Sequence, residues 1–177
     1  YTEDIMILVS KKSNIKTLKD LYGKRVAVGP PGSGAWFSAN SIKSKLDLNW
    51  VAIERAKDES LLSVIVGDTD ALVIVGGYPI KMYSDMSPDM KNRVQLMDLS
   101  DKALNSLYTS AVLPAKSYSW QPEPVHIRKT TSLLATAADV PEPATAKLLS
   151  CLADSKPELL KWGHPKWKEV NFSLLRK

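Results

Sequence analysis

The sequence predicts an α/β protein with an open, doubly wound and mostly parallel sheet. Two observations predict this class. Short apolar runs alternate with amphipathic segments along most of the chain, which is typical of strands connected by helices. In addition, residues 71–75 are continuously apolar, as expected of a central strand covered on both faces. We therefore expect any ligand to bind beyond the carboxyl ends of the strands.

The first 110 residues contain the clearest strand, loop and helix units. Strands are expected at residues 5–9, 24–28, 50–53, 71–75 and 93–97. Helices are expected at residues 13–21, about 35–46, from a cap at Asp58 to about 66, and at 101–107. The helix at 35–46 carries Trp36, Ala39, Ile42 and Leu46 along one stripe, so this stripe is predicted to face the sheet.

The remaining third of the chain has a different pattern. Residues 110–124 are rich in proline and are predicted to be irregular, so a lobe boundary is placed close to residues 108–114. A strand pair is expected within residues 125–135. Three helices are expected after it, at about residues 141–153, 156–162 and 165–170.

Composition excludes several classes of protein. The chain has 177 residues, of which 44% are hydrophobic and 24% are charged, a profile typical of a globular protein with a sizeable core. The net charge is +5, but its basic residues occur as scattered pairs among acidic ones, so a solvated surface is expected and nucleic-acid binding is disfavoured. These pairs are Lys11-Lys12, Lys24-Arg25, Arg128-Lys129 and Arg176-Lys177. No apolar stretch approaches the ~20 residues of a membrane span.

Residues suited to metal binding or catalysis are few. His126 and His164 lie far apart and lack the spacing of metal ligands. Cys151 falls in an apolar helical pattern, where a small core residue is expected. Ser33 and Ser38 lack the sequence of a nucleophile elbow. The sequence therefore predicts no metal, no cofactor and no enzyme activity.

A glycine-rich loop at residues 29–34, Gly-Pro-Pro-Gly-Ser-Gly, joins a predicted strand to a predicted helix. Glycines let the backbone approach a ligand closely, and the free N–H groups of the helix favour a carboxylate or phosphate. Nucleotide loops are disfavoured, because Ala35 replaces the lysine of a phosphate loop and the glycine spacing differs from the dinucleotide pattern. The predicted ligand-binding residues of this segment are Gly29, Pro31, Gly32, Ser33, Gly34, Ala35 and Trp36. A tight connection without a ligand stays the alternative.

A second candidate loop, Gly76-Gly77-Tyr78-Pro79, follows the predicted central strand. It should lie beside the first loop, and Tyr78 offers a hydroxyl and a ring to a ligand. We therefore add Gly76, Gly77 and Tyr78 to the predicted ligand-binding residues. The alternative is that the glycines only end a strand. The nearby acidic pair Asp68 and Asp70 is explained more simply as a turn before a buried strand.

Several segments together resemble type II periplasmic binding proteins, and most closely the TAXI family of solute receptors for TRAP transporters. These segments are residues 18–34, residues 67–71 with 76–79, Leu113-Pro114-Ala115 with Tyr118, and Gly163-His164-Pro165. The resemblance implies an extracytoplasmic or periplasmic receptor that binds a small carboxylated or amino-acid-like solute and delivers it to membrane transporter subunits. It also implies a signal peptide in the precursor and an amino-terminal lobe segment before Tyr1.

The same resemblance divides the chain into lobes. Residues 1–21 would be a strand and hinge of the first lobe, residues 22–109 a second α/β lobe with the glycine loop, and residues 110–177 the return to the first lobe with a helical carboxyl terminus. Two other functions stay open. The first is a ligand-sensing effector domain of a regulatory protein on the same fold, and the second is an enzyme on this fold.

Overall fold

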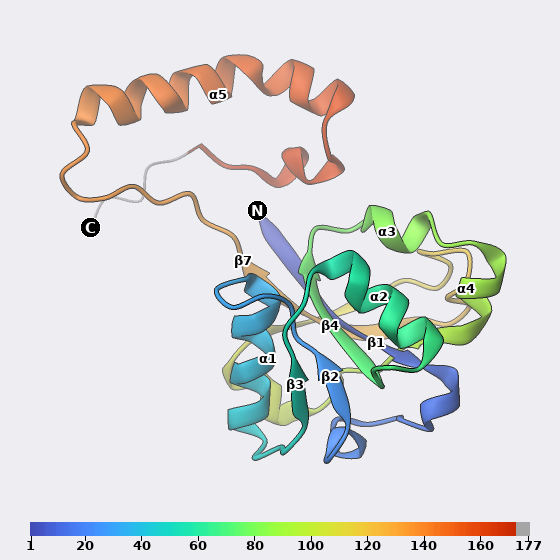
Figure 1. Ribbon diagram of the computed structural model, residues 1–177. Coiled ribbons are helices and arrows are strands. Elements are labelled where there is room, and N and C mark those ends of the chain that lie inside the picture. The colour runs from blue at the N-terminus through green and yellow to red at the C-terminus, as the bar shows by residue number, and fades with distance from the viewer. Residues whose placement is uncertain (173–177) are drawn as a thin grey trace. The chain divides into compact units, whose positions relative to one another are not determined.

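The computed structural model describes residues 1–172. Its strands are β1 (Thr2–Ser10), β2 (Arg25–Ala27), β3 (Val51–Ile53), β4 (Ala71–Gly76), β5 (Val94–Leu96), β6 (Thr109–Leu113) and β7 (Val125–Thr131). The α-helices are α1 (Gly34–Lys45), α2 (Lys57–Val66), α3 (Lys81–Ser84), α4 (Pro88–Arg93) and α5 (Glu142–Trp162). The 3₁₀ helices are η1 (Lys11–Ser13), η2 (Leu18–Leu21), η3 (Lys102–Ser106) and η4 (Pro165–Glu169). Figure 1 shows these elements in sequence colours.

The sheet has the strand order β3-β2-β4-β1-β7-β6, and β5 also pairs with β1. β2 is parallel to both β3 and β4, whereas β1 is antiparallel to β4 and β5, and β6 is antiparallel to β7. The α/β class is confirmed, but the prediction of a mostly parallel sheet holds only for β3, β2 and β4. Parallel neighbours need a crossover connection, and in this chain α1 and α2 connect only those three strands.

The core lies on both faces of the sheet. In β1, Ile5, Ile7 and Val9 belong to a cluster that includes residues of α1, and Met6 and Leu8 belong to a second cluster that includes residues of α2. All five side chains are buried. The two helices therefore cover opposite faces of the sheet (Figure 1), and the doubly wound arrangement is confirmed.

The chain forms two compact units, residues 4–130 and residues 1–3 with 131–177. The larger unit contains every buried hydrophobic residue that the structure describes, from Ile5 to Ile127. In the smaller unit, no residue of the 21-residue helix α5 is buried. Polar contacts hold η4 to the start of β1, since the Lys166 Nζ donates to Glu169 Oε1 at 2.9 Å and to Thr2 Oγ1 at 3.4 Å.

Two sequence-based predictions for residues 109–135 are wrong. Residues 109–113, expected to be largely irregular, form the strand β6, in which Ala111 and Leu113 contribute to the core. Alternate residues of this segment face the core, but the segment is short and the prolines that follow it favoured the prediction of irregular structure. β7 pairs with β6 rather than with a second strand within residues 125–135, because the intervening loop is long enough to return the chain.

The helical predictions also need correction. Residues 141–162 were expected to form two helices, yet α5 runs unbroken through Pro157, and its apolar spacing continues on both sides of this proline. Cys151 was expected in a core but is exposed, like the rest of α5, which has no buried residue. The predicted helices at 13–21 and 101–107 are short 3₁₀ turns. Among residues 1–172, no helix is both long and apolar enough to cross a bilayer.

One of the scattered basic pairs is not a solvated surface. Arg128 is 1% exposed, and its guanidinium donates to the carbonyl oxygens of Leu99 and Asp101 and to Asn105 Oδ1. Burial lowers the pKa of Arg128, while the charges of Asp101 and Asp98 raise it. This arginine therefore connects β7 to the segment around η3 as a structural residue. The pair Arg176-Lys177 lies outside the described residues.

The double-sided core predicts a large cost for truncation of β1. Leu8 is fully buried between β1's neighbours, so Leu8→Ala should reduce the free energy of unfolding by about 2–5 kcal/mol through lost burial and a cavity. Leu62→Ala on α2, where the side chain is 55% exposed, is the matched control and should change it by less than about 0.5 kcal/mol. Chemical denaturation measures both, and equal costs would contradict the assignment of the core.

The contact between η4 and β1 predicts a pH dependence. The hydrogen bond from Lys166, together with those from Thr2, lowers the pKa of Glu169 from 4.5 to about 2 despite partial burial. Its contribution to stability is therefore present above pH 4.5 and is lost as the pH falls to about 2. An NMR titration of the Glu169 carboxyl should have its midpoint near the lower value, and Lys166→Met should move the midpoint upward. A wild-type midpoint unchanged by Lys166→Met would contradict this contact.

Candidate functional site

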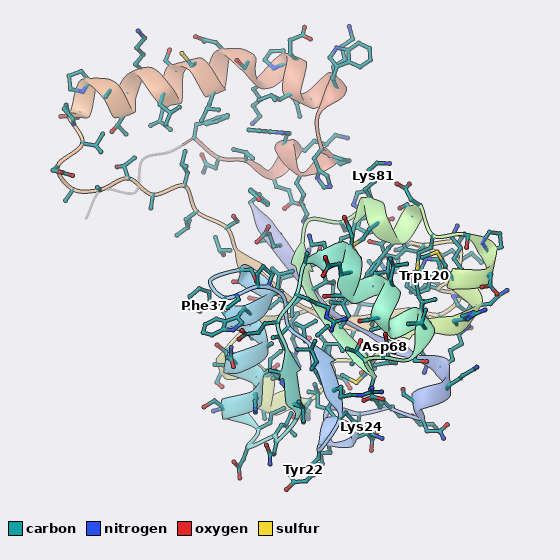
Figure 2. All side chains as sticks on the ribbon, viewed as in Figure 1. Tyr22, Lys24, Phe37, Asp68, Lys81 and Trp120 are labelled. Atoms are coloured by element: carbon teal, nitrogen blue, oxygen red, sulfur yellow. The ribbon has the colours of Figure 1, made fainter. Side chains whose placement is uncertain are left out.

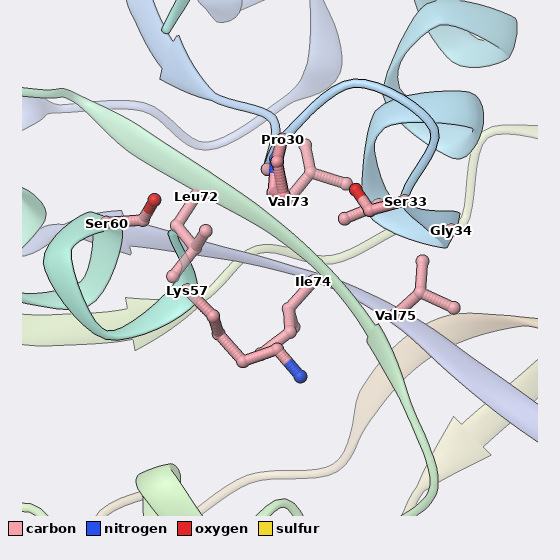
Figure 3. A pocket seen from close by; sticks show the side chains of 11 residues that line it. Pro30, Ser33, Gly34, Lys57, Ser60, Leu72, Val73, Ile74 and Val75 are labelled. Atoms are coloured by element: carbon pink, nitrogen blue, oxygen red, sulfur yellow. The ribbon is translucent and has the colours of Figure 1, made fainter. Parts of the chain in front are cut away.

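A pocket of about 240 Å³ lies at the carboxyl ends of the parallel strands β2, β3 and β4. The glycine loop after β2, the first turns of α1 and α2 and residues 72–75 of β4 enclose it (Figure 3). The residues that line it are Gly29, Pro30, Ser33, Gly34, Ala35, Lys57, Ser60, Leu72, Val73, Ile74 and Val75. Open α/β sheets place their ligands at this edge.

The backbone of the first loop requires glycine at two positions. Gly29 and Gly32 have φ angles of +80° and +82°, which L residues adopt only with strain. Gly29 has a second constraint, because a Cβ atom there would lie 2.8 Å from Ser33 Oγ, whereas at Gly32 it would meet no atom within 4 Å. The loop therefore folds back closely on Ser33, the N-cap residue of α1.

The amino end of α1 presents free N–H groups to the pocket. Ser33 is the N-cap, and its Oγ accepts a hydrogen bond from the Trp36 backbone N–H at 3.2 Å. The N–H groups of Gly34 and Ala35 donate to no acceptor within residues 1–172. Since these two residues line the pocket, the positive end of the helix dipole is directed at its contents.

The amino end of α2 lies on the other side of the same pocket, which Lys57 and Ser60 line. Asp58 was predicted to cap this helix, but Ala56 occupies the N-cap position and offers no side-chain hydrogen bond. Asp58 instead lies in the first turn, where a negative charge still interacts favourably with the dipole. Figure 3 shows the Lys57 side chain extended toward Ile74.

Trp36 does not line the pocket. Its indole N–H donates to Glu54 Oε1 at 2.8 Å, and its ring meets Phe37 edge-on with centroids 5.2 Å apart. Phe37 is exposed and projects from α1 (Figure 2). Of the seven residues predicted in the first loop, Gly29, Ser33, Gly34 and Ala35 line this pocket, while Pro31, Gly32 and Trp36 do not.

The second loop lies near the first, since a Cβ atom on Gly34 would come 3.6 Å from Val75 at the end of β4. Gly76, Gly77 and Tyr78 nevertheless do not line the pocket. Tyr78 is held by other parts of the protein: its backbone N–H donates to the buried Asp4 at 3.0 Å, and its hydroxyl donates to the Ser117 carbonyl at 2.9 Å. Within this structure its polar groups therefore serve to fix the loop.

Four aromatic residues reinforce that loop. Tyr118 contacts Tyr78 and Tyr83 edge-on and stacks on Trp120. Its hydroxyl oxygen accepts a hydrogen bond from the Ile80 backbone N–H at 2.9 Å, and burial raises its pKa to about 12. The Trp120 indole donates to the Tyr83 carbonyl, and Figure 2 labels its position. The β6–β7 connection thus holds the residues after β4 in place.

The acidic residues and histidines considered from the sequence lie elsewhere. Asp70 directly precedes β4, at the opposite end of the strand from the glycines, and its carboxylate accepts a hydrogen bond from the Arg25 backbone N–H at 2.8 Å. His126 pairs with Asp98 at 2.8 Å. Partial burial raises the pKa of Asp98, but hydrogen bonds from Ser100 and His126 outweigh it and lower that pKa to about 2. Among residues 1–172, no group of three metal-ligating side chains converges.

Several residues of the pocket were not predicted from the sequence. Pro30 was passed over within the glycine loop, and Lys57, Ser60 and residues 72–75 of β4 were not considered. One available signal was the rule that ligands bind at the carboxyl ends of strands. Applied to β3, it selects the segment that leads directly into Lys57.

Comparisons with known proteins agree with this architecture. The sequence profile of the NMT1-like family matches residues 1–175. Among solved structures, an ancestral arginine-binding protein bound to arginine is 18% identical with a TM-score of 0.53, and the alignment covers 96% of this chain and 60% of that one. The substrate-binding protein of an amino acid ABC transporter is 16% identical with a TM-score of 0.53, covering 96% and 58%.

A mutant of ArgBP from T. maritima is also similar, at 19% identity and a TM-score of 0.50, covering 96% of this chain and 56% of that one. The chain therefore spans less than two thirds of the length of each of these structures. The likeness shows the fold, which is that of type II periplasmic binding proteins. Assignment to the TAXI family in particular stays a prediction.

The two strained glycines of the first loop provide an internal comparison. Gly32→Ala should reduce the free energy of unfolding by about 1–2 kcal/mol, the cost of an L residue in the left-handed region. Gly29→Ala should cost more, because its Cβ would also lie 2.8 Å from Ser33 Oγ. Urea denaturation of both variants measures the difference. Equal costs would show that Ser33 does not approach Gly29 as closely as described.

Proposed function

The chain belongs to the NMT1-like family, and from this premise we propose that it is part of an extracytoplasmic solute-binding receptor. It binds a small carboxylated or amino-acid-like ligand and delivers it to a membrane transporter. The observation that carries the proposal is the pocket at the strand ends, which two helix amino ends and the glycine loop enclose.

The geometry suits binding of an anion without catalysis. The Gly34 and Ala35 N–H groups are fixed donors at the positive end of α1, so they bind a carboxylate without reorganisation. The two serines that line the pocket are already hydrogen-bonded: Ser33 caps α1, and the Ser60 hydroxyl donates to the Ala56 carbonyl at 2.8 Å. Neither has a histidine as neighbour among the hydrogen bonds of residues 1–172, which supports a binding role.

The proposal extends to the transporter. The resemblance of residues 18–34 and the other quoted segments to TAXI receptors favours a TRAP transporter. A protein of the same fold is, by its name, the substrate-binding protein of an amino acid ABC transporter, which makes an ABC transporter the alternative. The membrane subunits that copurify with the full-length protein after crosslinking distinguish the two.

Filling the pocket should weaken ligand binding. Ala35 is the second residue of α1 and lines the pocket, so Ala35→Leu places a larger side chain in the space of the ligand and should weaken binding at least about tenfold. Calorimetric titration of the full-length protein with a panel of short carboxylates and amino acids measures this.

The matched control is Ser44→Leu, an exposed position near the other end of α1, which should bind as the wild type does. If no member of the panel binds the wild-type protein, the receptor function is wrong. If binding persists in Ala35→Leu, the ligand occupies a different site.

A further inference from the structure

We propose that Lys57 is the residue that sets the ligand class of this pocket, selecting small aliphatic monocarboxylates over neutral and cationic solutes. This inference rests on the proposed receptor function and specifies its ligand. Lys57 is not part of the glycine loops and was not among the residues predicted from the sequence. Its assignment comes from the charge, the wall and the size of the pocket.

The charge of the pocket has one sign. Lys57 is the only ionisable residue among the eleven that line it, and no aspartate or glutamate does so. Within residues 1–172, its ammonium group makes no hydrogen bond or ion pair. Glu54, the acidic residue of the preceding loop, accepts the hydrogen bond of the Trp36 indole. Asp58 and Glu59 follow Lys57 in the first turn of α2 but do not line the pocket. A ligand carboxylate would therefore meet an available cation together with the amino ends of α1 and α2.

The remaining wall is aliphatic. Leu72, Val73, Ile74 and Val75 of β4 contribute it. The first three side chains alternate between the two cores and are almost fully buried, so the partly exposed Val75 offers most of the accessible apolar surface. A rigid apolar wall opposite a few polar groups favours a ligand with a hydrocarbon body and one polar end. The wall offers no acceptor side chain for an ammonium or guanidinium group.

The size of the pocket limits the ligand. The pocket volume of about 240 Å³ lies below the roughly 300–1,000 Å³ that is usual for ligand pockets. A small solute therefore suits this pocket better than a large one. Isovalerate, with seven non-hydrogen atoms, fits this description, and isovaleramide is its neutral counterpart of the same shape.

The test compares these two probes and L-arginine by calorimetric titration of the full-length protein. Isovalerate should bind more tightly than isovaleramide, and L-arginine should bind more weakly than both. Lys57→Met should weaken isovalerate binding about two- to fivefold, the range expected for an exposed charge pair, and should leave isovaleramide unchanged. Lys57→Arg keeps the charge and should retain the preference.

The matched control is Lys45→Met, which causes the same change in net charge. Lys45 is exposed at the last position of the twelve-residue helix α1, about 16 Å along the axis from its first residue at a rise of 1.5 Å per residue. The Lys45→Met variant should bind isovalerate and isovaleramide with the affinities of the wild type. A loss of affinity equal to that of Lys57→Met would show a general charge effect and overturn the assignment.

Failure of this inference differs from failure of the receptor function. Suppose that a member of the wider panel binds the wild-type protein and binds Ala35→Leu more weakly. If isovalerate does not bind, or if L-arginine binds more tightly than isovalerate, the ligand class is then wrong and the receptor function stands. If the ratio of isovalerate to isovaleramide affinity is the same in Lys57→Met as in the wild type, the role of Lys57 is wrong and the receptor function again stands. If no member of the panel binds, both proposals are wrong.

Discussion

The structure depends on one strand, β1, that is apolar on both faces. Ile5, Ile7 and Val9 face one core, and Met6 and Leu8 face the other, so β1 is stable only inside a sheet with a layer on each side. α1 and α2 provide layers on opposite faces, and their connections keep β2, β3 and β4 parallel. With both faces covered, the pocket lies at the carboxyl edge of these strands.

The α/β class was predictable because its signals are local. Continuous apolar runs mark β1 and β4, and the glycine loop marks the start of α1 within one residue of its position. The direction of β1 and the pairing of β6 with β7 were not predictable in this way, since strand pairing depends on residues distant in sequence. The exposure of Cys151 also depends on tertiary contacts, because an apolar spacing on a helix does not by itself supply a partner surface.

The candidate site was predictable only in part for the same reason. The positive φ angles of Gly29 and Gly32 follow from residue type, and Ser33 has the sequence position of an N-cap. The hydrogen bond of Tyr78 to Ser117, 39 residues away, and that of Trp36 to Glu54 have no local signal. These contacts direct both aromatic residues away from the role of ligand contact in this pocket.

We propose that the pocket at the strand ends binds a small anionic solute. Native mass spectrometry of the full-length protein, purified without removal of ligand, tests it most directly. The account predicts a retained small carboxylate that is lost in Ala35→Leu and kept in Ser44→Leu. A protein that carries no solute and responds to no carboxylate or amino acid added to it would contradict the claim.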